Sequence, residues 1–452
     1  MKKILSAFLA GAMLCSMLAG CAPDKGADVK PSNDPAPSGA VSTAPTQQEK
    51  TTLTFMMWGG MPEADLSLQS MLEEARPDLA EKYEIKTVIG GKQDTEMLEK
   101  LRLAVIADNE DVPDFFQVNY SSVPELAEAG IIADLSEAMA PYKDAMNEGI
   151  WNLSVYKGKN IGLPFQANAK VWLYRQDMFA EAGIDVTAIK DEDDLIEAGK
   201  LLQAKYPDSY IWNIGPQNAH YNLGMITSGN GARFVDDEGN YIVSTDPGTR
   251  RAFEMFKKLA DSGVTAPIND WTPDWEKAFS DGTLASCLTG LWMTHFLTDY
   301  AAGQEGKWAV TQFPALGGAE GGSEAGGALY CVTDKSEHKA EVIEVLTGLM
   351  LSPEGEKVFF NHLGGIPMLK EVLEDPAIKD LDDPFYGKYM PEAIEATNRI
   401  KVFPFTPAST IEFNIANQYL DKYIAGELSL DEALQGAERD MKNQIGNPFE
   451  GY

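Results

Sequence analysis

The pattern of apolar and polar positions divides the chain into three stretches. Lys2 and Lys3 precede an uncharged, mostly apolar run over residues 4–18, which is typical of a secretory signal peptide and too short for a membrane span of about 20 residues. Residues 22–50 hold five prolines and no aromatic residue, so they cannot bury enough apolar surface to fold. We therefore expect a signal peptide over 1–20, a disordered linker over 21–50 and a folded region from residue 51.

The folded region begins with strand and helix patterns in alternation. Short apolar runs at 53–58, 85–89 and 114–118 predict strands, and helical patterns over 62–76, 94–105 and 124–129 separate and follow them. This order predicts an α/β fold with a mostly parallel sheet that helices cover on both faces. Such sheets bind ligands beyond the carboxyl ends of their strands, so the loops at 58–60 and 119–122 should lie side by side.

The later part of the chain predicts a second lobe. A hairpin at 156–164 leads into an apolar strand at 171–174, residues 236–240 form a further hairpin turn, and helical patterns cover 248–262 and 340–351. About 400 residues exceed what one hydrophobic core usually supports. We therefore expect two lobes.

Charge limits the classes of ligand. The chain carries 69 acidic and 37 basic residues, for a formal net charge of -32. A field of that sign opposes nucleic acids and strongly anionic ligands, so a neutral or cationic ligand is favoured.

Motifs for catalysis or metal binding are weak. The four histidines are scattered, and neither H-E-x-x-H nor C-x-x-C occurs. The sequence GGSEA at 321–325 resembles a nucleophile elbow but ends in alanine, and the acidic turn at 236–240 lacks the glycine and glutamate of a calcium loop. We expect no enzyme activity, cofactor or metal. Cys287 and Cys331 could either pair or remain buried free thiols.

Aromatic residues beside polar ones give the positive evidence. Among eight tryptophans and sixteen tyrosines, several adjoin Gly, Asn, Asp, Thr or Ser: Trp58, Tyr120, Tyr221, Trp271 and Trp292. A sugar offers C–H faces to a ring and hydroxyl groups to amides and carboxylates, so such neighbours suit a carbohydrate site. The alternative for each ring is ordinary core packing.

Two resemblances extend this interpretation. Leu18-Ala19-Gly20-Cys21 resembles the lipobox of bacterial lipoproteins, which implies that Cys21 is acylated and holds the protein at the extracytoplasmic face of the cell membrane. The order of segments from residue 51 resembles extracellular solute-binding protein family 1, the carbohydrate-binding components of ABC importers. The segments are PDFF at 113–116, ELAEAGIIADL at 125–135, GLP at 162–164, LYR at 173–175, AFSDGTLA at 278–285, TGLW at 289–292, GG at 326–327, LSPEG at 351–355 and GGIP at 364–367.

The family resemblance implies a two-lobed periplasmic-binding-protein-like α/β fold with three interlobe crossings. Lobe I would comprise residues 51–165 and 326–367, and lobe II residues 166–325 and 368–452. The crossings would lie near 164, 314–326 and 365–369. The implied partners are a small-molecule carbohydrate and the permease subunits of an ABC transporter, and we expect a monomer that binds no nucleic acid.

Site residues follow from the resemblance position by position. Trp58 and Gly59 match the loop after the first strand, Asn119 and Tyr120 the loop after P-D-x-x, and Trp292 the stacking tryptophan of a G-P-W motif that here reads Gly-Leu-Trp. A further family aromatic would fall near Glu412 or Phe413. The expected ligand-binding set is completed by Gln166, Asn168, Gln217, Asn218, Tyr221, Trp271 and Gly327.

Two other functions remain open at this point. A lipid-anchored polysaccharide hydrolase would cleave an oligosaccharide, whereas a binding protein would not. A sensor that presents its ligand to a membrane kinase would share the fold with the importer component, and the neighbouring genes would separate the two.

Overall fold

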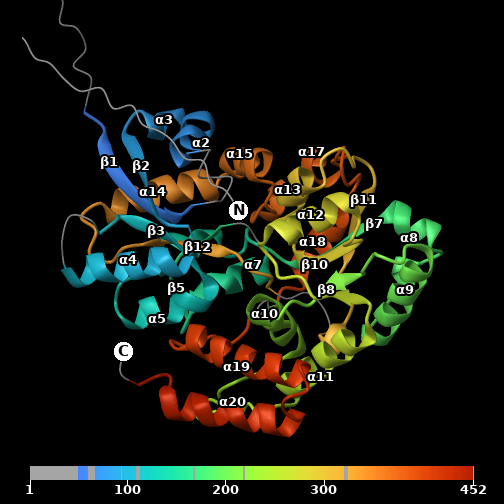
Figure 1. Cartoon of the computed structure of the whole chain (residues 1–452). Helices are drawn as coiled ribbons and strands as arrows, with labels where there is room; N and C mark the ends of the chain where they lie inside the picture. The colour runs from blue at the N-terminus through green and yellow to red at the C-terminus, as the bar shows by residue number, and fades with distance from the viewer. Residues whose placement is uncertain are drawn as a thin grey trace, which may run out of the picture. The chain divides into compact units, whose positions relative to one another are not determined.

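The computed structural model describes residues 49–59, 67–92, 94–107, 112–165, 168–216, 219–319 and 324–450. The expected signal peptide, nearly all of the linker and Cys21 lie outside these ranges. Strand and helix alternate at the start of the folded region as predicted (Figure 1). The elements are β1 (Thr51–Trp58), α2 (Leu68–Ala75), α3 (Pro77–Ala80), β2 (Tyr83–Gly91), α4 (Asp94–Ala107), β3 (Phe115–Asn119), the 3-10 turn η1 (Tyr120–Ser122) and α5 (Val123–Glu128).

The larger sheet has five strands in the order β2-β1-β3-β12-β6, with β6 at Leu163–Phe165 and β12 at Ala328–Val332. β1 runs parallel to β2 and β3, but β12 is antiparallel to both β3 and β6. The prediction of a mostly parallel sheet is therefore wrong. The reason is the route of the chain, because β12 returns to the sheet at the edge where β1 and β3 end and so must run in the opposite direction.

The smaller sheet has three antiparallel strands in the order β10-β7-β11. They are β7 (Lys170–Arg175), β10 (Ser286–Gly290) and β11 (Trp308–Gln312), and two short pairs, β4 (Val155–Tyr156) with β5 (Lys159–Asn160) and β8 (Trp212–Asn213) with β9 (Thr265–Ala266), complete the strands. The chain changes from one of these two sheets to the other between β6 and β7 and again between β11 and β12. The third crossing and the lobe boundaries stay predictions, since only helices follow residue 369.

Helices make up most of the remaining chain. In order they are α6 (Ser136–Met139), η2 (Ala140–Tyr142), α7 (Glu148–Leu153), α8 (Gln176–Glu181), η3 (Val186–Ala188), α9 (Glu192–Lys205), α10 (Ala219–Asn230), α11 (Pro247–Ser262), α12 (Pro273–Asp281), α13 (Met293–Tyr300), η4 (Leu316–Gly318), α14 (Lys339–Met350), α15 (Pro353–Leu363), α16 (Lys370–Leu373), α17 (Pro376–Lys379), α18 (Met390–Asn398), α19 (Ser409–Ile424) and α20 (Leu430–Gln444). Among the described residues, none of these helices combines the length and apolar content needed to cross a membrane.

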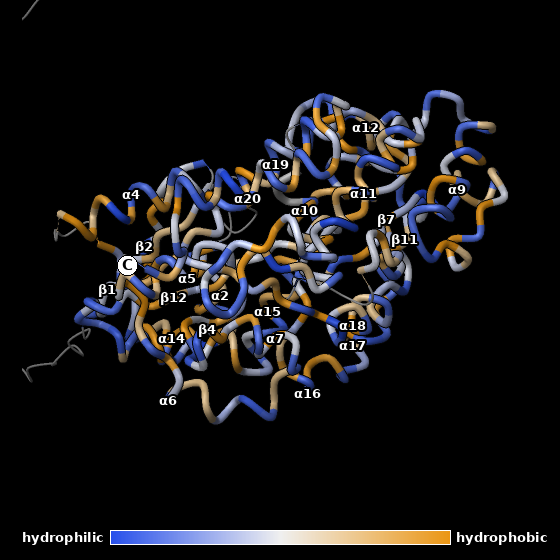
Figure 2. Tube along the Cα trace, turned by 90° about the horizontal axis from the view of Figure 1, so that it is seen from below, coloured by the Kyte–Doolittle hydropathy of each residue, from blue (hydrophilic) through white to orange (hydrophobic). Residues whose placement is uncertain are grey.

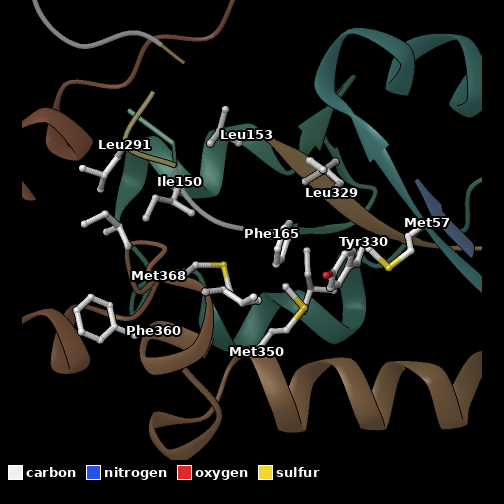
Figure 3. Packing of buried hydrophobic residues seen from close by; sticks show 14 of the residues in the cluster. Met57, Ile150, Leu153, Phe165, Leu291, Leu329, Tyr330, Met350, Phe360 and Met368 are labelled. Atoms are coloured by element: carbon white, nitrogen blue, oxygen red, sulfur yellow. The ribbon is translucent and has the colours of Figure 1, made fainter. Parts of the chain in front are cut away.

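Aromatic rings fill the centre of the core beside the larger sheet. Phe55 stacks on Phe115 with ring centroids 4.6 Å apart, and Tyr330 lies 5.0 Å from Phe55 and 4.8 Å from Phe165. Figure 3 shows Phe165 and Tyr330 face to face between the labelled methionines and leucines. The smaller sheet packs against a second cluster that includes Trp172. Outer helices such as α4 and α9 mix hydrophobic and hydrophilic positions along their length (Figure 2), as one-sided burial requires.

The packing decides whether Cys287 and Cys331 form a disulfide bond or remain free thiols. Cys287 in β10 and Cys331 in β12 are both buried free thiols. Burial raises the pKa of each thiol, so both behave as small apolar side chains.

A buried carboxyl group holds the segment that contains the predicted third crossing. Glu356, in the first turn of α15, is 3% exposed and accepts hydrogen bonds from the backbone N–H groups of Met368 (2.9 Å) and Leu369 (3.1 Å). Burial outweighs these hydrogen bonds and raises the pKa of Glu356 to about 8. The folded state therefore favours the protonated carboxyl group.

Stability should decline as pH rises because of this group. A carboxyl whose pKa is about 8 when folded and 4.5 when unfolded binds more protons in the folded state between those values. Its contribution is complete below pH 4.5 and lost as pH rises through 8, with a slope of at most about 1.4 kcal/mol per pH unit. Denaturant titrations at pH 5, 6.5 and 8 should show Glu356→Gln with a shallower decline than wild type. Exposed Glu354→Gln in the same turn is the matched control, and equal slopes for all three proteins would contradict the argument.

Candidate functional site

Several predicted site residues lie at one edge of the larger sheet. Trp58 ends β1 and Asn119 ends β3, and these two strands are paired neighbours. Gly327, at φ +125°, precedes Ala328, which pairs with Asn119 and with Phe165. Trp58 and Gly59 therefore lie beside the end of β3, as predicted, since the parallel strands end together, while Gly60 lies outside the described residues.

The side chains at this edge are largely covered. Trp58 is 9% exposed and Tyr120 is 5% exposed, so neither ring offers a wide face to solvent. The Tyr120 hydroxyl group is buried and has no hydrogen-bond partner among the described residues. The Asn119 amide donates to the Asp94 carboxylate (2.5 Å), and the Gly59 N–H donates to the carbonyl oxygen of Gly91 (2.7 Å).

The two passages between the sheets run side by side. Ala169 and Glu324 form an antiparallel bridge, and the Ala325 N–H donates to the carbonyl oxygen of Asn168 (2.9 Å). Asn168 is 3% exposed, and its side-chain oxygen has no partner in the part of the chain that the structure describes. Burial raises the pKa of Glu324 to about 7, although its carboxylate accepts from the Gly326 N–H (2.7 Å). These two paired segments, residues 168–169 and 324–325, are called the ribbon below. The ribbon joins the larger sheet to the smaller one.

Trp292 is fixed against the same ribbon. It follows β10 immediately before α13, and its indole N–H donates to the carbonyl oxygen of Ala325 (2.9 Å). The position requires glycine two residues earlier, because a Cβ on Gly290 would lie 2.3 Å from the Trp292 indole nitrogen and 2.4 Å from the Ala325 carbonyl oxygen. The Gly-Leu-Trp sequence therefore brings the indole edge down onto the backbone that links the sheets.

A tight loop presents Trp271 to Trp292. The Asn213 amide donates to the carbonyl oxygen of Ile268 (2.9 Å) and to the Asp270 carboxylate (2.5 Å), which ties this loop to β8. Thr272 caps α12 by accepting a hydrogen bond from the Trp275 N–H. Between them Trp271 adopts φ +61°, a conformation that costs about 1–3 kcal/mol and that the surrounding structure must hold in place.

The rings themselves supply that support. Trp271 stacks on Trp292 with centroids 5.3 Å apart and an interplanar angle of 21°. Its ring centroid also lies 5.4 Å from that of Trp275 and 5.5 Å from that of Phe296. Trp271 nevertheless remains 51% exposed. A stacked and half-exposed tryptophan offers an apolar face to a ligand without a large rearrangement.

These rings line a small hollow. Its walls combine four tryptophans with amide, carboxylate and hydroxyl groups: Trp212, Asn213, Asn222, Asp270, Trp271, Trp275, Cys287, Leu288, Thr289 and Trp292. A second small hollow lies beside Pro164 and Met368 and is lined by apolar side chains and Glu356. The first therefore has the better lining for a polar ligand with apolar faces.

The structure brings together only part of the predicted set. Two of its members, Trp271 and Trp292, line the hollow. Four others lie at the edge of the larger sheet: Trp58, Asn119, Tyr120 and Gly327. The ribbon, which contains Asn168 and Ala325, connects this edge to the hollow. Gln166, Gln217 and Asn218 fall outside the described residues, as does the side chain of Tyr221. Glu412 and Phe413 are 0% and 2% exposed, and the Glu412 carboxylate accepts from the Tyr241 hydroxyl group (2.9 Å), so neither side chain faces an open site.

Sequence reasoning missed most of the other lining residues. Trp212 with Asn213 repeats the pattern of an aromatic beside an amide, so the same criterion could have found this pair. Asn222, on α10, and Leu288, on β10, carry no comparable pattern. In the described ranges, no group of three or more His, Cys, Asp or Glu residues is placed to hold a metal ion.

Known proteins share both sequence and fold with this chain. The model of the bacterial extracellular solute-binding protein family matches residues 74–384. The arabinooligosaccharide-binding protein of Halalkalibacterium halodurans is 24% identical over 361 residues, which cover 75% of this chain and 79% of the relative. Its namesake from Bacillus subtilis is 25% identical over 389 residues, covering 84% of each chain.

A solved structure confirms the fold. The binding protein associated with an ABC transporter of B. animalis subsp. lactis, solved with β-1,6-galactobiose, superposes with a TM-score of 0.73 at 24% identity and covers 89% of this chain and all of its own. The predicted α/β fold of two-lobed solute-binding proteins is thus confirmed. With the family model matching well over half of its length, this chain belongs to the bacterial extracellular solute-binding protein family.

Proposed function

We propose that this protein captures a sugar or oligosaccharide and delivers it to the permease of an ABC importer. The observation that carries the proposal is the stacked pair of Trp271 and Trp292 in a hollow that also contains Asn213, Asn222 and Asp270. Rings bind the C–H faces of a sugar, and amides and carboxylates bind its hydroxyl groups. The relatives support the ligand class, since they include arabinooligosaccharide-binding proteins and a diacetylchitobiose-binding protein.

The proposed mechanism is binding without catalysis. A ligand that contacts both lobes stabilises the closed form through its differential affinity, and the three predicted crossings rotate to allow closure. To shift the lobes from mostly open to mostly closed, a ligand must supply about 5.5 kcal/mol of differential affinity. The ribbon of Asn168 and Ala325 lies where such a rotation would act, because it joins the two sheets.

The proposal includes the cellular location of the protein and its oligomeric state. The mature protein would begin at acylated Cys21 and remain at the extracytoplasmic face of the cell membrane. Residues 21–50 would form a flexible linker between the lipid anchor and the folded region, which keeps the protein within reach of the permease. We propose that it works as a monomer.

Calorimetry on the purified folded region would test the ligand class. Arabinotriose, chitobiose and maltotriose should include at least one ligand that binds, whereas amino acids and a dipeptide should not. The best ligand should be recovered intact by chromatography after long incubation, because a binding protein releases what it captured. Binding of peptides alone, or cleavage of the oligosaccharide, would refute the proposal.

A separate test addresses the anchor. In cells fed an alkyne-tagged fatty acid, the wild-type protein should become labelled and remain with the membrane fraction. Cys21→Ala should abolish the label. Label that persists in Cys21→Ala would place the acyl chain elsewhere.

A further inference from the structure

One wall of the tryptophan hollow carries an acidic side chain. Four indole rings line the hollow, and Asp270 is the single charged residue among the described residues that line it with them. The Asn213 amide, which also belongs to the lining, holds the Asp270 carboxylate by a hydrogen bond of 2.5 Å. Asp270 directly precedes Trp271, whose ring is half exposed. A ligand that stacks on the open face of Trp271 therefore lies beside the wall that holds the carboxylate.

The charge of Asp270 acts within the hollow. Cys287, on β10, is 3% exposed and contributes to the same lining. Burial and the charge of Asp270 both raise the pKa of the Cys287 thiol. A negative potential that disfavours a thiolate at this position favours a cation there for the same reason.

Further acidic residues surround the half-exposed tryptophan. Residues 269–276 contain three acidic residues and no basic one. Two of these acids, Asp274 and Glu276, are exposed in the first turn of α12. The next basic residue, Lys277, forms an ion pair with Asp281 at the other end of that helix. Together with the formal net charge of -32, these acids attract a cationic ligand toward the hollow.

The aromatic cluster behind the hollow also experiences this potential. Tyr300 packs on Trp275 with ring centroids 5.8 Å apart. Burial, together with the charges of Glu276 and Asp299, raises the pKa of Tyr300 to about 12. The rings therefore add to the acidic potential and do not oppose it, since the face of an indole ring is itself attractive to a cation.

We propose that the hollow binds the ammonium group of an amino sugar, so that the protein prefers a saccharide with a glucosamine-type unit over its neutral counterpart. This inference rests on the proposed carbohydrate function. The sugar ring would stack on Trp271, and its ammonium group would lie against the indole faces and donate to the Asp270 carboxylate. A hydroxyl group at the same position gains only an ordinary hydrogen bond, whereas an ammonium group gains a charge-assisted one and a cation–π contact.

The test compares sugars that differ only in the group on one carbon atom. Calorimetry on the purified protein, at about pH 6 where a primary amine is protonated, measures two matched sets. One set is cellobiose, the glucosamine disaccharide chitobiose and diacetylchitobiose, and the other is galactose, galactosamine and N-acetylgalactosamine. In at least one set the amine should bind at least about 10-fold more tightly than both the hydroxyl and the N-acetyl sugar. The N-acetyl sugar is the control for the nitrogen substituent without its charge.

Substitution of the carboxylate tests the contact itself. Asp270→Asn keeps the size of the side chain and an oxygen that can accept from Asn213, but it removes the charge. The preference for the amine over the hydroxyl sugar should fall below about threefold, since only the cation–π contact remains. Because this preference is a ratio measured within one protein, a general loss of affinity does not affect it. Asp274→Asn removes an exposed charge from the same segment and should keep the preference within about twofold of wild type, because solvent and salt screen that charge.

The outcomes separate this inference from the proposed function. If the amine binds no more tightly than its counterparts in either set, or if arabinotriose or maltotriose binds and no amino sugar does, the ammonium site is wrong and the carbohydrate function stands. A preference that is unchanged in Asp270→Asn overturns the site equally. If no sugar binds, charged or neutral, both proposals fail. The wild-type comparison stands even if Asp270→Asn does not fold, and Trp271→Leu, which removes the open aromatic face, then serves as the second variant and should also lower the preference.

Discussion

Trp292→Ala should weaken binding of the best oligosaccharide by about 10- to 100-fold. The substitution removes one stacking face, worth about 0.5–1.5 kcal/mol beyond its buried area, together with that area. It also removes the ring on which Trp271 stacks at 5.3 Å. Because Trp271 holds a strained φ of +61°, the loss of this support should displace the second ring as well. Calorimetry on the purified protein measures the change.

The conservative variant separates the ring from its hydrogen bond. Trp292→Phe keeps an aromatic face but cannot donate to the Ala325 carbonyl oxygen, as the indole N–H does at 2.9 Å. It should retain more affinity than Trp292→Ala, and both proteins should unfold cooperatively. If Trp292→Ala binds as tightly as wild type while remaining folded, the hollow beside Trp271 is not the ligand site.

The βαβ order could be predicted from the sequence because local patterns determine it. Apolar runs such as 53–58 are strand-length whatever they pair with, and caps and glycines such as Gly130 mark helix ends. The direction of β12 could not be predicted in this way. Its residues would form the same strand in either orientation, and only the long excursion through the smaller sheet makes it antiparallel.

The site was harder to predict because burial is a tertiary property. Trp58 and Trp271 both adjoin polar or glycine neighbours, yet Trp58 is 9% and Trp271 is 51% exposed. The difference arises from long-range packing, since β1 is an interior strand, flanked by β2 and β3, while the loop of Trp271 leaves a short strand pair. Likewise, nothing local to Asn222 indicates that α10 brings it to the hollow. Adjacency to polar residues therefore identifies candidates, and the fold selects among them.

A substitution at Gly290 tests whether the ribbon between the sheets and the Trp292 ring are positioned together. Among the atoms near a Gly290 Cβ, the indole nitrogen of Trp292 at 2.3 Å belongs to a side chain that can move, but the Ala325 oxygen at 2.4 Å belongs to the backbone. Gly290→Ala must therefore shift Trp292, the ribbon or both. We expect it to lower the free energy of unfolding by about 1–3 kcal/mol, as overpacking does, and to weaken oligosaccharide binding at least about 10-fold.

A glycine on α10 provides the matched control. A Cβ on Gly224 would meet only a ring carbon of Phe413 at 3.9 Å, so Gly224→Ala should leave binding unchanged and raise the free energy of unfolding by about 0.5–1 kcal/mol, since alanine favours a helix interior. Denaturant titration and calorimetry on both variants measure the two effects. If Gly290→Ala loses stability but keeps full affinity, the ribbon alone has moved and Trp292 is positioned independently of it. If Gly290→Ala loses about as much affinity as Trp292→Ala, a single methyl group is enough to displace the ring from the ligand. Gly290, the Trp292 indole and the Ala325 carbonyl group then position the ring together.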